Sequence, residues 1–172
     1  VHSIEHATLM DEEAASMMRE QGVFMVPTLS ALATTAACRL GCGVPDSARD
    51  KAKSMTKRHA VSFKNALRDG IQIAMGTDAG TPFNFHGENA QELERMVAFG
   101  MSPMQAILAS TSAAARLIGI QDQVGTIEKG KVADLLLIEG NPIRRIDLLR
   151  DRSRIVGVMQ AGKWAAGPLS KT

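Results

Sequence analysis

Short apolar runs alternate with longer segments of helical periodicity in the first part of the chain. Val23–Val26, which Pro27 ends, and Ile71–Met75, which lies between two glycines, are apolar almost throughout. Runs of this length with such boundaries favour buried strands over helices. Val1–Glu5 looks like the end of a further strand.

Helical segments separate these strands. Asp11 is an expected N-cap and Gly22 an expected stop for the first helix. Further helices are predicted over residues 30–40, 46–68, 88–99 and 102–119. The order strand, helix, strand predicts parallel βαβ units and an α/β fold, either a doubly wound sheet or a (β/α)8 barrel.

The pattern changes beyond Gln121. Short apolar strands are predicted over residues 133–138 and 155–159, separated by turns rich in glycine, asparagine and proline. Short strands with turn signals indicate a small β module. We therefore predict two domains, 1–121 and 122–172.

Composition excludes several classes of function. The 172 residues carry 20 basic and 18 acidic side chains, a net charge of +2, and only 3% aromatic residues. This balance argues against nucleic-acid binding. No apolar run approaches the ~20 residues that span a bilayer, so no membrane segment is predicted.

The chain starts at Val1 inside a predicted strand. We therefore expect it to be the carboxyl-terminal part of a longer protein. The amino-terminal half of that protein would then be a partner of this part. A cytoplasmic location is expected, although a missing beginning would hide a signal peptide. Cys38 and Cys42, four residues apart in an Ala-rich segment, are predicted to be free buried thiols, which suits a reducing compartment.

Two residues at predicted strand ends could do chemistry together. His6 follows the first strand, and Asp78 follows Ile71–Met75 in the loop Gly76–Gly80. Parallel strands present their carboxyl ends at one edge of a sheet, where α/β folds place their active sites. Imidazole and carboxylate suit a zinc- or manganese-type ion, which would lower the pKa of a bound water so that Asp78 could take its proton.

Simpler interpretations stand beside this one. Asp78 could be a helix cap or loop anchor, and His6 beside Glu5 a structural pair. His86, in a loop rich in glycine and asparagine, could equally be functional or hydrogen-bonded within the loop. His59, in the long predicted helix, is interpreted as structural or solvent-facing, and His2 as a packed strand residue. No nucleophile elbow, Walker loop or dinucleotide fingerprint competes with the metal hypothesis.

Several segments in this order resemble the amidohydrolase superfamily. The segments are Ser3–Ala7, Pro27–Leu29, Gly76–Pro82, His86–Asn89 and Gly125–Leu135. They are similar to the metal-dependent Xaa-Pro dipeptidase (prolidase-like) and imidazolonepropionase-related branch, over nearly the whole chain.

The resemblance implies a TIM-like (β/α)8 barrel flanked by a small β-sandwich. Val1–Glu5, Val23–Val26 and Ile71–Met75 would then be barrel strands six, seven and eight. Residues from about 122 onward would be the later strands of the sandwich.

The resemblance also implies roles for the site residues. His6 would bind a metal, and Asp78 would bind metal and shuttle a proton. His86 and Glu5 would contact the substrate. One or two divalent ions, zinc above all, are implied. The family's His-x-His motif, carboxylated lysine and further histidine have no counterpart here and are expected to precede Val1, so this part alone should be inactive. A homo-oligomer is expected.

The function that follows is hydrolysis of an amide bond in a dipeptide or N-acyl amino acid, by a metallo-dipeptidase or carboxypeptidase that uses a metal-activated hydroxide. A second possibility is a mononuclear hydrolase of a cyclic amide, amidine or imidazolone, or a deaminase, in which His6 and Glu5 contact substrate. A non-enzymatic possibility is a barrel scaffold that has lost its metal.

Overall fold

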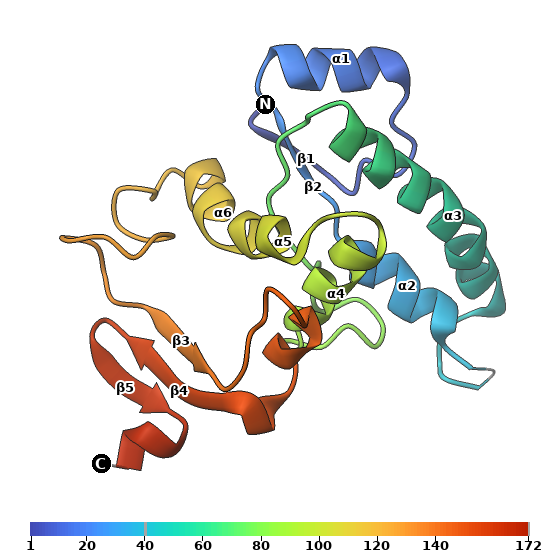
Figure 1. The fold of residues 1–172 in the computed structure, drawn as a ribbon. Coiled ribbons are helices and arrows are strands. Elements are labelled where there is room, and N and C mark those ends of the chain that lie inside the picture. Colours follow the sequence, from blue (N-terminus) through green and yellow to red (C-terminus); the bar gives the residue numbers. More distant parts are fainter. Residues whose placement is uncertain (40, 172) are drawn as a thin grey trace.

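The computed structural model describes residues 1–39 and 41–171, so Leu40, the end of one predicted helix, lies outside the described residues. The elements in order are β1 Ser3–Glu5, α1 Glu12–Glu20, β2 Phe24–Val26, α2 Leu29–Ala37, α3 Asp46–Arg68, α4 Ala90–Ala98, α5 Pro103–Ser110, α6 Ser112–Leu117, β3 Leu135–Ile138, β4 Ile155–Gln160 and β5 Lys163–Ala166. Short 3-10 helices lie at Ile146–Leu149, Arg152–Arg154 and Pro168–Lys171. Most of the predicted helices and strands are confirmed (Figure 1).

The amino-terminal sheet is parallel. β1 pairs with β2 in the register Ser3 to Phe24 and Glu5 to Val26. The helix between these strands begins as predicted, because the side chain of Asp11 accepts a hydrogen bond from the Ala14 N–H at 2.8 Å.

The prediction of a regular strand over residues 71–75 is wrong. This segment joins β2 through a single parallel bridge between Met25 and Ile73. On one side, the Ala74 N–H donates to the Met25 carbonyl at 3.1 Å, but the next N–H, that of Met75, donates to the Ala109 carbonyl of α5 at 2.9 Å. Successive N–H groups of an extended segment point to opposite edges, so the Met75 N–H faces away from β2 and α5 takes the place of a further strand at that edge.

Gly76 allows this segment to pass close to β2. A Cβ atom added at Gly76 would lie 2.5 Å from Cγ1 of Val26, closer than carbon atoms approach without displacement. A side chain here would therefore push apart the segment that leads to Asp78 and the end of β2.

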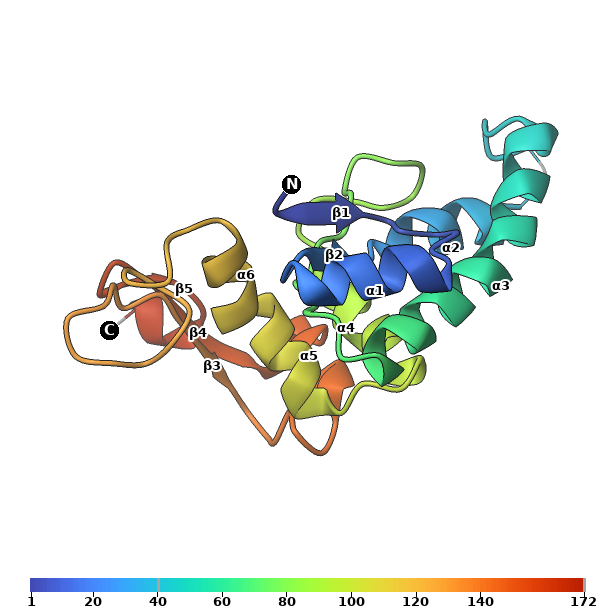
Figure 2. The same cartoon turned by 90° about the horizontal axis from the view of Figure 1, so that it is seen from above.

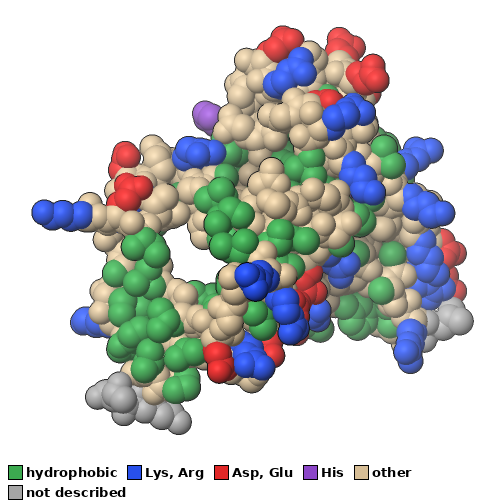
Figure 3. All heavy atoms as spheres, in the orientation of Figure 1, with side chains coloured by type: hydrophobic (Ala, Val, Ile, Leu, Met, Phe, Trp, Pro, Cys, Tyr) green, Lys and Arg blue, Asp and Glu red, His purple; other side chains and the backbone are tan. Residues whose placement is uncertain are grey.

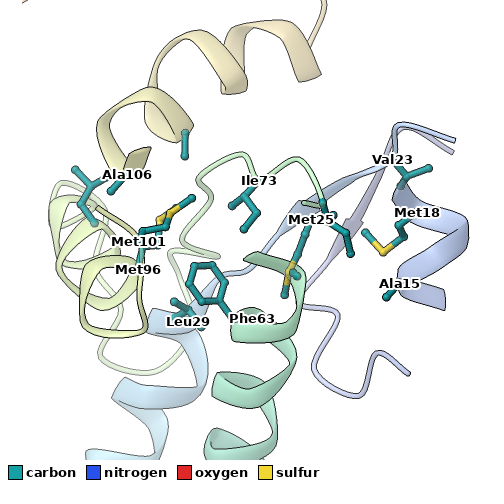
Figure 4. Packing of buried hydrophobic residues seen from close by; sticks show 14 of the residues in the cluster. Ala15, Met18, Val23, Met25, Leu29, Phe63, Ile73, Met96, Met101 and Ala106 are labelled. Atoms are coloured by element: carbon teal, nitrogen blue, oxygen red, sulfur yellow. The ribbon is translucent and has the colours of Figure 1, made fainter. Parts of the chain in front are cut away.

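The core lies between the parallel sheet and its helices. Met25 of β2, Phe63 of α3 and Met96 of α4 are fully buried and converge with Ile73 (Figure 4). Two of these four are methionines, whose flexible side chains fill irregular spaces between elements. This packing holds the ends of the strands in fixed positions.

Helices α2 and α3 form a hairpin that extends to one side of the molecule (Figure 2). At its tip Cys38 and Cys42 form a disulfide, with Cα atoms 6.2 Å apart, and both are partly exposed. The prediction of free buried thiols is therefore wrong. The helix ends at Ala37 and Cys38 has extended backbone, so the chain turns back instead of placing both cysteines on one helical face. The argument for a reducing compartment loses its support.

The carboxyl-terminal part forms an antiparallel sheet in the order β3–β4–β5. Helices α4 to α6 lie between it and the parallel strands (Figure 1). The single helix predicted after Ser102 is divided into α5 and α6 at Thr111, which has φ −122° and ψ −91°. No helix in the described part is both long enough and apolar enough to cross a membrane.

Candidate functional site

The carboxyl ends of the parallel segments meet at one edge, and the backbone there is unusual. His6, Ala7, Thr28 and Asp78 have φ values of 64°, 45°, 48° and 53°. Left-handed backbone at residues other than glycine is uncommon and costs roughly 1–3 kcal/mol at each position unless the surroundings hold it. Two of these residues are the predicted metal ligands. Because residues in this conformation cluster at functional sites, we take this edge as the candidate site.

His6 is held from two directions. Its N–H donates to the Val26 carbonyl at 2.8 Å, which continues the β1–β2 pairing. Its Nδ1 lies 2.5 Å from Oγ1 of Thr28. The side chain is exposed, and Nε2 forms no hydrogen bond with any described residue. A contact at one ring nitrogen that leaves the other free is compatible with metal binding by the free nitrogen.

Asp78 is held through its backbone. The buried side chain of Asn84 donates from Nδ2 to the carbonyls of Thr77 at 2.6 Å and Asp78 at 3.0 Å. Gln91 of α4 in turn donates to Oδ1 of Asn84 at 3.1 Å. The Asp78 carboxylate is exposed and has no hydrogen bond or ion pair within the described residues. The loop is therefore anchored while its carboxylate stays free.

Replacement of Asn84 by alanine should loosen this loop. Asn84→Ala removes the donors to two carbonyls, and we expect the free energy of unfolding to fall by about 2 kcal/mol. Amide hydrogen exchange at Gly80, whose N–H donates to the Asn84 carbonyl at 2.8 Å, should quicken. Asn65→Ala on α3 is the control, since its side chain forms no hydrogen bond in the described part of the chain. Equal stability of the two variants would contradict the anchoring role.

Glu92 of α4 holds the segment after Thr28. Its side chain is 0% exposed, and its two carboxylate oxygens accept from the N–H groups of Leu29 at 2.7 Å and Ser30 at 2.8 Å. These are the first residues of α2, so the carboxylate satisfies donors that a helix start leaves unpaired. Burial raises the pKa of Glu92, and the hydrogen bonds from Ser30 and Leu29 oppose the rise.

The structure places the remaining candidates as follows. Glu5 is exposed and accepts a 2.6 Å hydrogen bond from the Ser3 hydroxyl. His86 is exposed, and its Nε2 is 3.8 Å from the position that a Cβ of Gly80 would occupy, so it lies over the Asp78 loop. His2 is exposed and precedes β1, so its interpretation as a packed strand residue is wrong. His59 is 2% exposed, which agrees with the structural interpretation and contradicts the solvent-facing one.

Topology brings His6 and Asp78 to one edge but not into contact. β2 lies between β1 and the segment that leads to Asp78. Strands two places apart in a sheet are separated by about 10 Å, which is suited to side chains that reach a shared ion from opposite sides. No group of three or more histidine, cysteine or acidic side chains within the described residues could hold an ion alone. His6 and Asp78 are donors of the kinds that metal ions bind, and a complete site would need further ligands.

The sequence patterns did not point to Asn84 or Glu92. The sequence contains a weak indication that Glu92 is buried, because Glu92 lies four residues before Met96 on the apolar stripe of α4. Asn84, between Phe83 and Phe85, has no periodic signal. Its role depends on the loop conformation.

A separate hollow of about 900 Å³ lies between α5, α6 and β3. Apolar side chains border this opening in Figure 3. Its lining includes Ile107, Ala114 and Leu135, but none of His6, Asp78 or His86. It is therefore not the candidate site.

Comparison with known sequences identifies the family. Residues 1–165 match the family model described as "Amidohydrolase family". The chain therefore belongs to the amidohydrolase family.

Several individual proteins are similar to this chain. Ochratoxinase from Aspergillus niger is 31% identical over 168 residues, which are 96% of this chain and 34% of that protein. A solved Xaa-Pro dipeptidase with bound methionine is 40% identical, with a TM-score of 0.88 over 97% of this chain and 40% of that one. A 5-methylthioadenosine/S-adenosylhomocysteine deaminase from Teredinibacter turnerae is 29% identical over 113 residues, 58% of this chain and 25% of the relative. This chain thus spans well under half the length of each.

Proposed function

We propose that this chain supplies one edge of the active site of a metal-dependent amidohydrolase that cleaves the amide bond of a dipeptide or N-acyl amino acid. One observation carries the proposal. His6 and Asp78 stand at the same sheet edge on strained backbone, and the Nε2 atom and the carboxylate have no partner within the described residues. The similarity to an Xaa-Pro dipeptidase and to ochratoxinase supports the substrate class.

Each residue has a role in this proposal. Nε2 of His6 and the carboxylate of Asp78 would hold a divalent ion, which we propose to be zinc. Such an ion lowers the pKa of bound water and polarises the amide carbonyl. Asp78 accepts the proton of the attacking water and passes it to the leaving amine nitrogen. His86, over the Asp78 loop, and Glu5 are proposed substrate contacts.

The remaining ligands, among them a carboxylated lysine, are proposed to come from an amino-terminal part of the protein. In this arrangement β1, β2 and residues 71–75 are barrel strands six, seven and eight. Residues from 122 onward belong to a β-sandwich domain.

Removal of metal from the full-length protein tests the proposal. We expect dialysis against a chelator to abolish release of amino acids from a library of Xaa-Pro dipeptides and N-acyl amino acids, and added zinc to restore it. The fold should persist after dialysis, since His6 and Asp78 are exposed and contribute little to the core; circular dichroism checks this. Undiminished hydrolysis after complete metal removal would refute the proposal.

The similarity to a deaminase favours one alternative, hydrolytic release of ammonia from a heterocycle. Ammonia and free amino acid are separable products. Ammonia from a purine substrate, with no hydrolysis of any peptide or N-acyl amino acid, would replace the first proposal by this one.

A further inference from the structure

His59 is a polar side chain in a place where an apolar one would pack more easily. It lies on α3 with 2% of its surface exposed, four residues before the fully buried Phe63. Its Nε2 atom is buried and has no hydrogen-bond partner among the described residues. Buried nitrogens without partners are rare in proteins and call for an explanation.

The groups around this imidazole belong to the candidate site. The peptide groups of His6 and Pro27 lie close enough to the ring to favour its protonated form, as facing carbonyl oxygens do. Burial has the larger, opposite effect and lowers the pKa of His59.

Ser62 acts on the same segment from one helical turn further along α3. Its hydroxyl donates to the Ala7 carbonyl. Residues three apart on a helix share a face, so His59 and Ser62 both lie on the side of α3 that faces the ends of β1 and β2. The contacted segments contain three of the left-handed residues, His6, Ala7 and Thr28.

We propose that His59 and Ser62 are positioning residues for the His6 imidazole. They hold the turns that follow β1 and β2 at a fixed separation, and that separation sets the 2.5 Å contact between Nδ1 of His6 and Oγ1 of Thr28. The contact in turn fixes the direction of Nε2. Without the support from α3, the strained turns relax toward ordinary backbone and the ring rotates.

This inference rests on the proposed function, because it assumes that His6 binds a metal. The orientation of the His6 ring can be tested separately. In the full-length protein, Ser62→Ala and His59→Gln are the test variants. Ser54→Ala is the matched control, because Ser54 is exposed on the same helix and donates only to the Lys51 carbonyl.

We expect zinc affinity of the metal-free protein, measured by competition with a chromogenic chelator, to fall by about 10- to 100-fold in Ser62→Ala and His59→Gln, as for other groups that orient metal ligands. The visible spectrum of the cobalt-substituted variants should change, and kcat should fall more than KM rises. Ser54→Ala should match wild type in all three.

Lower thermal stability of Ser62→Ala with wild-type zinc affinity and cobalt spectrum would overturn the inference, because a merely structural role moves stability alone. If wild type binds no zinc, the proposed function fails, and a crystal structure of Ser62→Ala then tests the positioning role alone. Loss of the contact between Nδ1 of His6 and Oγ1 of Thr28 supports the positioning role, and its retention refutes it. Should His59→Gln fail to fold, Ser62→Ala carries the test.

Discussion

Asp78→Asn in the full-length protein is expected to lower amide hydrolysis by about 10³-fold or more, with little change in substrate binding. The carboxamide has the shape of the carboxylate but cannot accept the proton of the attacking water, and general-base catalysis contributes about 10²–10⁴-fold. Asparagine is also the replacement that least disturbs the loop, because it tolerates the left-handed backbone that Asp78 adopts at φ 53°. Steady-state kinetics on a dipeptide substrate measure the effect.

The control for this variant is Asp122→Asn, an exposed carboxylate outside the candidate site, which should retain wild-type turnover. Both variants should unfold within about 0.5 kcal/mol of wild type, as is usual for surface substitutions. Near-normal turnover of Asp78→Asn would remove Asp78 from the mechanism. Loss of folding would instead show that its carboxylate supports the loop.

Glu92→Leu should have the largest effect on stability. The substitution leaves the N–H groups of Leu29 and Ser30 buried without acceptors and removes negative charge from the start of α2. Each lost hydrogen bond to a charged group is worth roughly 1.5–3 kcal/mol. Part of this is offset, because the buried carboxylate no longer has to be desolvated. We expect a net loss of about 3 kcal/mol in the free energy of unfolding, measured in denaturant.

Glu94→Gln is the matched control on the same helix. Glu94 pairs with Arg150 at 3.4 Å, but both side chains are partly exposed. Pairs of this kind contribute about 0–1 kcal/mol. A loss in Glu92→Leu no larger than that in Glu94→Gln would show that the buried carboxylate does not hold α2.

The pH dependence of stability should reveal the same group. Burial raises the pKa of Glu92, so the folded state binds its proton more tightly than the unfolded chain does. The stability from this proton is fully present below the ordinary pKa of glutamate, about 4.3, and is lost as pH rises through the raised pKa. The free energy of unfolding of wild type, relative to Glu92→Gln, should therefore fall as pH rises from about 4 toward neutrality. A difference that rises with pH would mean a lowered pKa.

Local sequence was sufficient for most helices and for β1 and β2. Asp11 and Ser102 are caps with short-range partners, Ala14 and Gln105, so their hydrogen bonds depend on neighbours in the chain. The same reasoning failed at residues 71–75, where a carbonyl of α5 takes the N–H of Met75. It failed at Cys38 because the end of α2 reverses the chain.

The sequence by itself indicated an α/β fold through the order of its apolar runs and helices, and the family through the order of its motifs. It also indicated the two residues proposed to bind metal, because both follow predicted strands. It left open what supports those two residues. Only the tertiary structure decided that Glu92 and Ser62 hold the turns after β2 and β1, across separations of 63 and 55 residues. The left-handed backbone at His6, Thr28 and Asp78 persists because hydrogen bonds from distant helices and loops oppose the local steric preference. No local pattern can encode that balance, since its partners meet only after the chain has folded.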